Sequence, residues 1–140
     1  MKVLSVASEA VPLVKTGGLA DVAGALPAAL APLGVEMRTL LPGYPAVMAA
    51  AKRRKRVVEY ASLFGGPATI YAFGAAGLDL LALDAPHLYE RPGGPYGAPG
   101  GGDWPDNWRR YAALGRAAAD VAQGTSGQWR PDVLHAHDWQ

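Results

Sequence analysis

Residues 2–41 alternate between short apolar runs and a helical pattern, and few folds accommodate that order. The run KVLSVA at residues 2–7 is typical of a buried parallel strand, and Val35 to Leu41 is a second such run. Between them, apolar residues recur every three or four positions from Leu19 to Leu30, and Gly34 follows as a stop. The order predicts a strand–helix–strand unit whose two strands lie parallel in one sheet.

An insertion rich in strand-forming residues follows this unit. Three apolar runs, Val57–Phe64, Ala68–Phe73 and Leu78–Leu83, are separated by short glycine-containing breaks, so we expect hairpins at one edge of the sheet. Residues 86–105 then contain six Gly and five Pro, and this composition predicts a long loop.

The last part of the chain returns to the helix–strand alternation. Asn107–Gln123 has apolar residues at helical spacing, and Asp132–His135 reads as a short final strand. The whole pattern predicts a doubly wound α/β domain with a mostly parallel sheet, an edge β insertion, and ligands at the carboxyl ends of the strands. Since no helix follows the last strand, we expect residues 1–140 to be the opening portion of a larger fold.

Charge and cysteine content exclude several classes of function. With 13 Lys+Arg against 12 Asp+Glu, the net charge of +1 argues against nucleic-acid binding, and without Cys there is no disulfide framework or thiolate nucleophile. The basic run Lys52–Arg56 is expected to be solvated. Because the chain shows neither a signal-peptide pattern nor 18 consecutive apolar residues, we expect a cytoplasmic protein that does not bind membranes.

The loop after the first predicted strand carries the clearest chemical signal. Gly17-Gly18 would let the backbone turn tightly and expose N–H groups beside the positive end of the helix dipole, and Lys15 adds a cation. This pattern fits a phosphate cradle and a plain glycine turn with a solvated lysine equally well. The spacing matches neither the P-loop nor the dinucleotide-binding fingerprint.

Three strings in this chain resemble one known family. They are SEAVPLVKTGGLADVAGALPAAL at residues 8–30, DAPHLYERPGGPY at residues 84–96 and RPDVLHAHDWQ at residues 130–140. Together they look like the N-terminal signature of bacterial glycogen synthases and plant starch synthases. The resemblance implies the GT-B fold of two Rossmann-like domains, with residues 1–140 as an incomplete N-terminal domain and the C-terminal nucleotide-binding domain absent.

The same resemblance implies a retaining transfer of glucose from ADP-glucose to the non-reducing end of an α-1,4-glucan, without a metal or a cofactor. It implies that Lys15 contacts the sugar nucleotide near its phosphates, that Gly17 and Gly18 allow close backbone approach, and that Asp21 lies nearby. Because the second domain is missing, we expect the fragment to be inactive alone.

The resemblance also places Glu9, Tyr96 and His137 among the substrate-binding residues and Asp138 among the catalytic ones. A tyrosine can stack on a sugar ring, and a carboxylate can hold sugar hydroxyls. From the residues alone, other interpretations stay open: Glu9 as a surface-loop acid, Tyr96 as an ordinary aromatic and Asp138 as a helix N-cap.

Two other functions remain as alternatives. A non-catalytic module that binds glucan or nucleotide would use the same loops, and His135, His137 and Asp138 could form part of a metallohydrolase site. Trp104 and Trp108 could form a sugar-stacking platform, but we expect them to pack beneath the start of the helix that follows.

Overall fold

The computed structural model describes residues 1–125, 127 and 129–140, and within these residues six strands form one sheet. Four strands are parallel to one another: β1 (Lys2–Val6), β2 (Glu36–Pro42), β5 (Leu78–Asp84) and β6 (Val133–Ala136). The other two, β3 (Lys55–Leu63) and β4 (Gly66–Ala75), pair antiparallel beyond β5. The expected α/β sheet with an edge β insertion is confirmed.

The strand order determines where a ligand can bind. The sheet runs β3-β4-β5-β2-β1-β6, so the parallel strands stand in the order third, second, first, fourth, as in a Rossmann fold. The chain therefore reverses its direction across the sheet between β1 and β6. In folds of this kind, ligands bind outside the carboxyl ends of the strands at that switch point.

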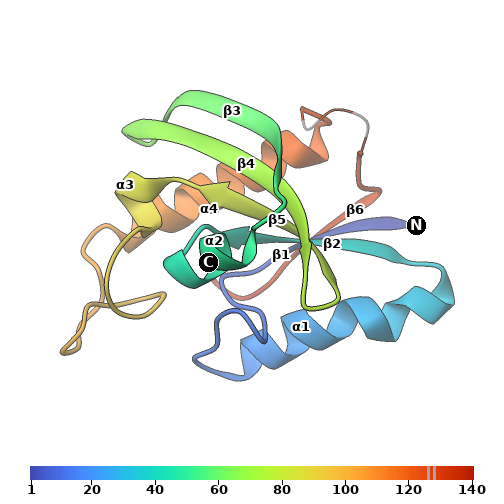
Figure 1. Cartoon of the computed structure of the whole chain (residues 1–140), viewed down its shortest axis with the longest axis horizontal. Helices are drawn as coiled ribbons and strands as arrows, with labels where there is room; N and C mark the ends of the chain where they lie inside the picture. The colour runs from blue at the N-terminus through green and yellow to red at the C-terminus, as the bar shows by residue number, and fades with distance from the viewer. Residues whose placement is uncertain (126, 128) are drawn as a thin grey trace.

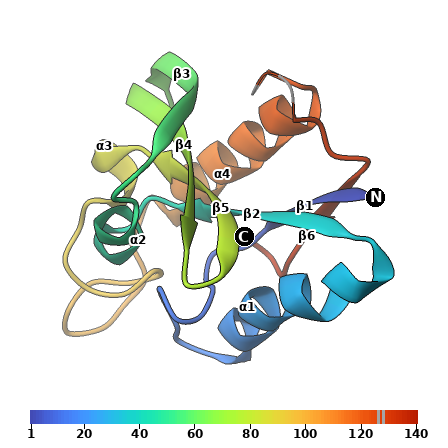
Figure 2. The same cartoon turned by 45° about the vertical axis from the view of Figure 1, so that its right-hand side comes forward.

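Two long helices cover opposite faces of the sheet, namely α1 (Gly18–Leu30) and α4 (Asn107–Ala122) (Figures 1 and 2). Strand residues Leu4, Leu40 and Leu80 are fully buried between them. Burying a leucine side chain contributes about 1.5–3 kcal/mol, so these strands hold the two helix layers together.

The first helix follows the prediction closely. It begins at Gly18 and ends at Leu30 with Pro27 inside it. A short 3-10 turn, η1 (Ala31–Leu33), follows, and Gly34 ends it with a left-handed backbone at φ 77°.

Two short helices were not predicted. α2 (Pro45–Ala50) follows β2, and α3 (Pro86–Tyr89) lies in the stretch expected to be a loop. Both begin with a proline, whose fixed φ suits the first helical position. The rest of the predicted loop passes in front of the carboxyl edge of the sheet and returns to α4.

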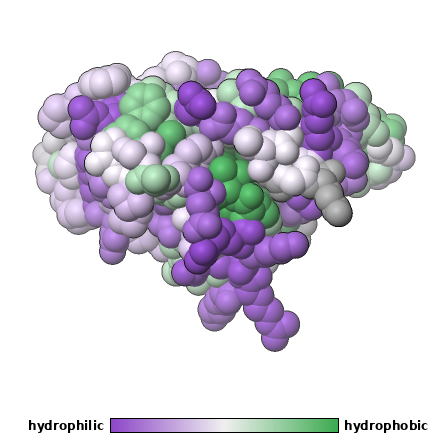
Figure 3. Space-filling view, turned by 90° about the horizontal axis from the view of Figure 1, so that it is seen from above, coloured by the Kyte–Doolittle hydropathy of each residue, from purple (hydrophilic) through white to green (hydrophobic). Residues whose placement is uncertain are grey.

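The surface near the edge β insertion is polar. The five residues of the basic run Lys52–Arg56 are exposed, as predicted. Figure 3 looks onto the side of the molecule that carries β3 and β4 and shows mostly hydrophilic residues there, with a small hydrophobic recess. Among the described residues, no helix combines the length and apolar character needed to cross a membrane.

Candidate functional site

The segments that follow β1, β5 and β6 meet at the switch point of the sheet. His137 directly follows β6, and its backbone N–H donates to the carbonyl of Val6 at 3.0 Å. Its ring Nε2 lies 3.0 Å from the hydroxyl of Ser5 on β1. The ends of β1 and β6 are therefore joined by both backbone and side-chain contacts.

Glu9 lies at the centre of this edge. Its side chain is only 2% exposed, so the interpretation of Glu9 as a surface-loop acid is wrong. One carboxylate oxygen accepts from the hydroxyl of Thr16 at 2.7 Å and from the hydroxyl of Tyr96, and the other accepts from the backbone N–H of Thr16. Glu9 thus ties the loop after β1 to the loop after β5.

These contacts change the acidity of the groups involved. Burial alone would raise the pKa of Glu9, but the hydrogen bonds from Tyr96 and Thr16 outweigh it and hold the pKa below the usual range. Burial and the bond to Glu9 raise the pKa of Tyr96 well above its usual value. A charged Glu9 and a neutral Tyr96 are therefore the stable pair at neutral pH.

The KTGG loop (residues 15–18) leads from Glu9 into α1. Its lysine, Lys15, forms an ion pair with Asp21 in the first turn of α1, with Nζ 2.7 and 2.8 Å from the two carboxylate oxygens. These side chains are 52% and 55% exposed, so the pair faces solvent and either partner can exchange it for a ligand.

The predicted tight turn at Gly17 is instead a bend with an extended backbone, at φ −153° and ψ −164°. Apart from the adjacent residues and the backbone of α1 itself, no atom of the described residues lies within 4 Å of the position of a Cβ at Gly17 or Gly18. Glycine has no side chain to cap a helix, so the first N–H groups of α1 stay available beside this open space.

Aromatic side chains form the wall opposite the KTGG loop. The ring of Tyr96 lies 6.0 Å from that of Trp139 and 6.1 Å from that of Tyr111, measured between centroids. The Tyr96 hydroxyl also accepts from Ser8 at 2.7 Å, since its own proton is donated to Glu9. Tyr111 is buried and Tyr96 is half-buried, so the 65% exposed Trp139 offers most of the ring surface on which a sugar could stack.

A cavity of about 330 Å³ lies beside this wall, which is the size of a small ligand site. Its lining includes Val14, next to Lys15, and Pro95, next to Tyr96, together with two buried tyrosines, Tyr44 and Tyr89. The cavity therefore borders both the KTGG loop and the aromatic wall.

The segment after β6 is more exposed to solvent than Glu9 is. Asp138 is exposed, has a left-handed backbone at φ 58°, and accepts from the N–H of Trp139 at 3.0 Å. The rings of His135 and His137 lie 4.1 Å apart, and burial together with His135 lowers the pKa of His137. Within residues 1–125, 127 and 129–140, no three His, Asp or Glu side chains are grouped as metal ligands.

The structure thus brings Glu9 and Tyr96 into direct contact and pairs Lys15 with Asp21. Sequence reasoning missed Ser8, Thr16, Trp139 and the polar residues of α4. Ser8 and Thr16 are neighbours of residues that were singled out, so adjacency to Glu9 and Lys15 could have identified them.

Of the two tryptophans expected to pack beneath the start of α4, Trp108 is 65% exposed. The packing expectation is therefore wrong for Trp108.

Comparison with known proteins identifies this arrangement. The fold aligns with the catalytic domain of Starch Synthase IV from Arabidopsis thaliana bound to ADP and acarbose, with a TM-score of 0.75 and 29% sequence identity, over 98% of this chain and 28% of that one. The α/β sheet of this chain therefore matches part of a starch synthase GT-B catalytic domain. The family model described as the starch synthase catalytic domain matches residues 2–140, and the chain belongs to that family.

Curated relatives agree with this assignment. The chain is 63% identical over 140 residues to a glycogen synthase of Mesorhizobium japonicum, covering all of this chain and 29% of that protein. It is also 63% identical over 137 residues to a glycogen synthase of Rhodopseudomonas palustris, covering 98% of this chain and 28% of the relative. The chain thus spans less than a third of the length of the curated relatives it matches.

Proposed function

We propose that the protein carrying this chain is a cytoplasmic glucosyltransferase that moves glucose from ADP-glucose to the non-reducing end of an α-1,4-glucan with retention of configuration. In this proposal the chain is part of the first of two Rossmann-like domains, and residues outside it complete the site. The observation that supports this proposal most is the KTGG loop at the switch point, where an exposed lysine lies beside the uncapped start of α1 and the Cβ positions of Gly17 and Gly18 are open.

The proposed reaction requires the departing diphosphate to be stabilised. When the bond between the glucose C1 and the diphosphate breaks, its electron pair stays with ADP, so negative charge grows on the diphosphate. Lys15 and the N–H at Gly18 would stabilise that charge, with Gly17 allowing close backbone approach, because cations and helix N-termini act strongly where charge develops. Asp21 would release Lys15 as the diphosphate takes its place.

The aromatic wall around Tyr96 provides contacts for the sugars. Tyr96 and Trp139 offer rings for stacking, His137 offers a hydrogen bond beside β6, and the cavity next to Pro95 leaves room for a glucan end. Asp138 is the proposed catalytic contact with the reacting glucose, since its carboxylate is exposed at the switch point. The new bond joins C1 to a glucan hydroxyl oxygen, and the proton of that hydroxyl passes to an oxygen of the departing diphosphate.

Transfer of labelled glucose to glycogen by the full-length protein tests this proposal. We expect transfer from ADP-glucose, less from UDP-glucose, and none by the 140-residue chain alone, because that chain spans only 29% of its glycogen synthase relative. A full-length protein that binds glycogen but transfers glucose from neither donor would favour the alternative of a non-catalytic binding module.

A further inference from the structure

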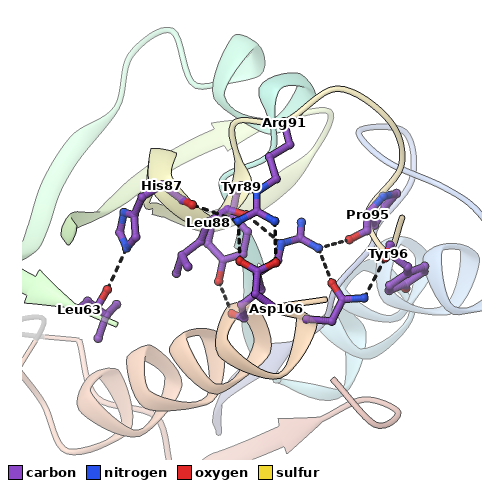
Figure 4. A network of polar contacts seen from close by, with 10 residues as sticks. Leu63, His87, Leu88, Tyr89, Arg91, Pro95, Tyr96 and Asp106 are labelled. Carbon is purple, nitrogen blue, oxygen red and sulfur yellow. Dashed lines mark hydrogen bonds and ion pairs between the residues drawn. The ribbon is translucent and has the colours of Figure 1, made fainter. Parts of the chain in front are cut away.

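Residues in the first turn of α4 donate hydrogen bonds to the loop carbonyls of Pro95 and Tyr96. The carbonyl of Pro95 accepts from Nη1 of Arg110 at 2.7 Å and from the hydroxyl of Tyr111 at 2.8 Å. The carbonyl of Tyr96 accepts from the side-chain amide of Asn107 at 2.8 Å. Two successive carbonyls of the loop are therefore fixed to one helix turn (Figure 4).

Arg110 is the centre of this network. It is 1% exposed, and it also donates from Nε to the carbonyl of Leu88 at 2.8 Å and from Nη1 to Oδ1 of Asn107 at 2.7 Å. The rings of Tyr89 and Tyr111 each lie 5.6 Å from its guanidinium carbon. These hydrogen-bond acceptors are neutral groups of the loop and the helix.

Burying the charged guanidinium of Arg110 in the first turn of α4 is energetically unfavourable. Burying a charge is unfavourable unless hydrogen bonds compensate it, and the first turn of a helix is the end where its dipole disfavours cations. An apolar side chain would avoid that cost but would take the arginine donors away from the buried carbonyls of Leu88 and Pro95. The guanidinium does what an apolar group cannot, because its fork fixes the carbonyls of Leu88 and Pro95 at once.

This loop delivers Tyr96 to the site. The Tyr96 hydroxyl donates to Glu9, and Glu9 in turn holds the backbone and side chain of Thr16 in the KTGG loop. A shift of the peptide at Pro95 would therefore move the aromatic wall and loosen its tie to the KTGG loop.

We propose that Arg110 is a positioning residue that keeps the Tyr96 hydroxyl on Glu9 and thereby sets the affinity for the glucan. This role rests on the proposed function, because it is exerted on residues assigned to substrate binding. Arg110 also lines the cavity beside Pro95, but it is 1% exposed and its Nε and Nη1 are taken up by the carbonyls of Leu88 and Pro95, so we expect it to act through the loop.

A double-mutant cycle in the full-length protein tests this role. Arg110→Lys keeps the charge but loses the fork, and Tyr96→Phe removes the hydroxyl; each should raise the KM for glycogen about tenfold or more, with a smaller change in the KM for ADP-glucose. If Arg110 acts through Tyr96, the double variant should be little worse than the poorer single one. Arg109→Lys, an exposed neighbour on α4, is the matched control and should leave both constants unchanged.

Two results would contradict the positioning role of Arg110. Independent losses that multiply in the double variant, or a lower melting temperature with an unchanged KM for glycogen, would overturn the positioning role. If Arg110→Lys does not fold, Asn107→Ala replaces it in the cycle, because it releases the Tyr96 carbonyl while retaining the arginine.

The proposed function can fail separately. A wild-type protein without transfer activity would refute that function alone, and the position of Tyr96 would then be read from the resonances of labelled tyrosine. Those of Tyr96 should shift in Arg110→Lys and stay fixed in Arg109→Lys; an unshifted Tyr96 in Arg110→Lys would overturn the positioning role.

Discussion

Replacing Glu9 with glutamine should destabilise the fold at neutral pH. The carboxylate of Glu9 accepts from the backbone and hydroxyl of Thr16 and from the hydroxyl of Tyr96. Glutamine has one acceptor oxygen, and its amide would face a donor. Losing one buried hydrogen bond to a charged group costs about 1.5–3 kcal/mol. For a chain of this length, that loss lowers the melting temperature by roughly 5–12 °C.

The loss should depend on pH. Since the folded pKa of Glu9 lies below its usual value, the charged form stabilises the fold above the ordinary glutamate pKa of about 4.3. That contribution is lost as the pH falls through the lowered pKa, so the difference between wild type and Glu9→Gln should shrink in acid.

Urea unfolding of wild type and Glu9→Gln at pH 7 and pH 3 measures both effects. Glu59→Gln is a suitable control, because Glu59 is paired with Arg56 on the exposed surface of β3, where such pairs are worth about 1 kcal/mol at most. Equal stability of wild type and Glu9→Gln at pH 7, or an unchanged difference at pH 3, would refute the reasoning.

Four further substitutions have defined outcomes. Lys15→Gln in the full-length protein should raise the KM for ADP-glucose by about 10- to 150-fold, as expected for losing a contact of about 1.5–3 kcal/mol, and unchanged kinetics would remove Lys15 from the site. Asp21→Asn should change unfolding by about 1 kcal/mol at most, since the pair with Lys15 is solvated; a larger loss would show a structural role. Gly24→Ala should cost about 1–3 kcal/mol in urea unfolding, because its Cβ would lie 2.5 Å from Val11 Cγ2 and 2.8 Å from the Val11 carbonyl. Gly115→Ala on α4, where the Cβ position is open among the described residues, should instead be neutral or stabilising.

Elements that are encoded locally could be predicted from the sequence. The apolar spacing from Leu19 to Leu30 and the stop at Gly34 defined α1, and the glycine breaks at residues 65–67 and 74–77 defined the hairpins. The short helix α2 could not be predicted in this way, because six residues give too little periodicity.

The candidate site was only partly predictable for a different reason. Arg109 and Arg110 are chemically identical neighbours in the sequence, yet one is exposed and the other is 1% exposed. Only the packing of the loop from Leu88 to Tyr96 against α4 distinguishes them. The same packing leaves Trp108 in solvent, with its ring 5.4 Å from the guanidinium of Arg109.

The central claim is that the KTGG loop binds the diphosphate of a sugar nucleotide. A crystal structure of the full-length protein with ADP-glucose tests it most directly. We expect diphosphate oxygens within hydrogen-bond distance of Lys15 Nζ and of the backbone N–H of Gly18, with the Lys15–Asp21 pair opened. A diphosphate bound away from this loop, with that pair intact, would contradict it.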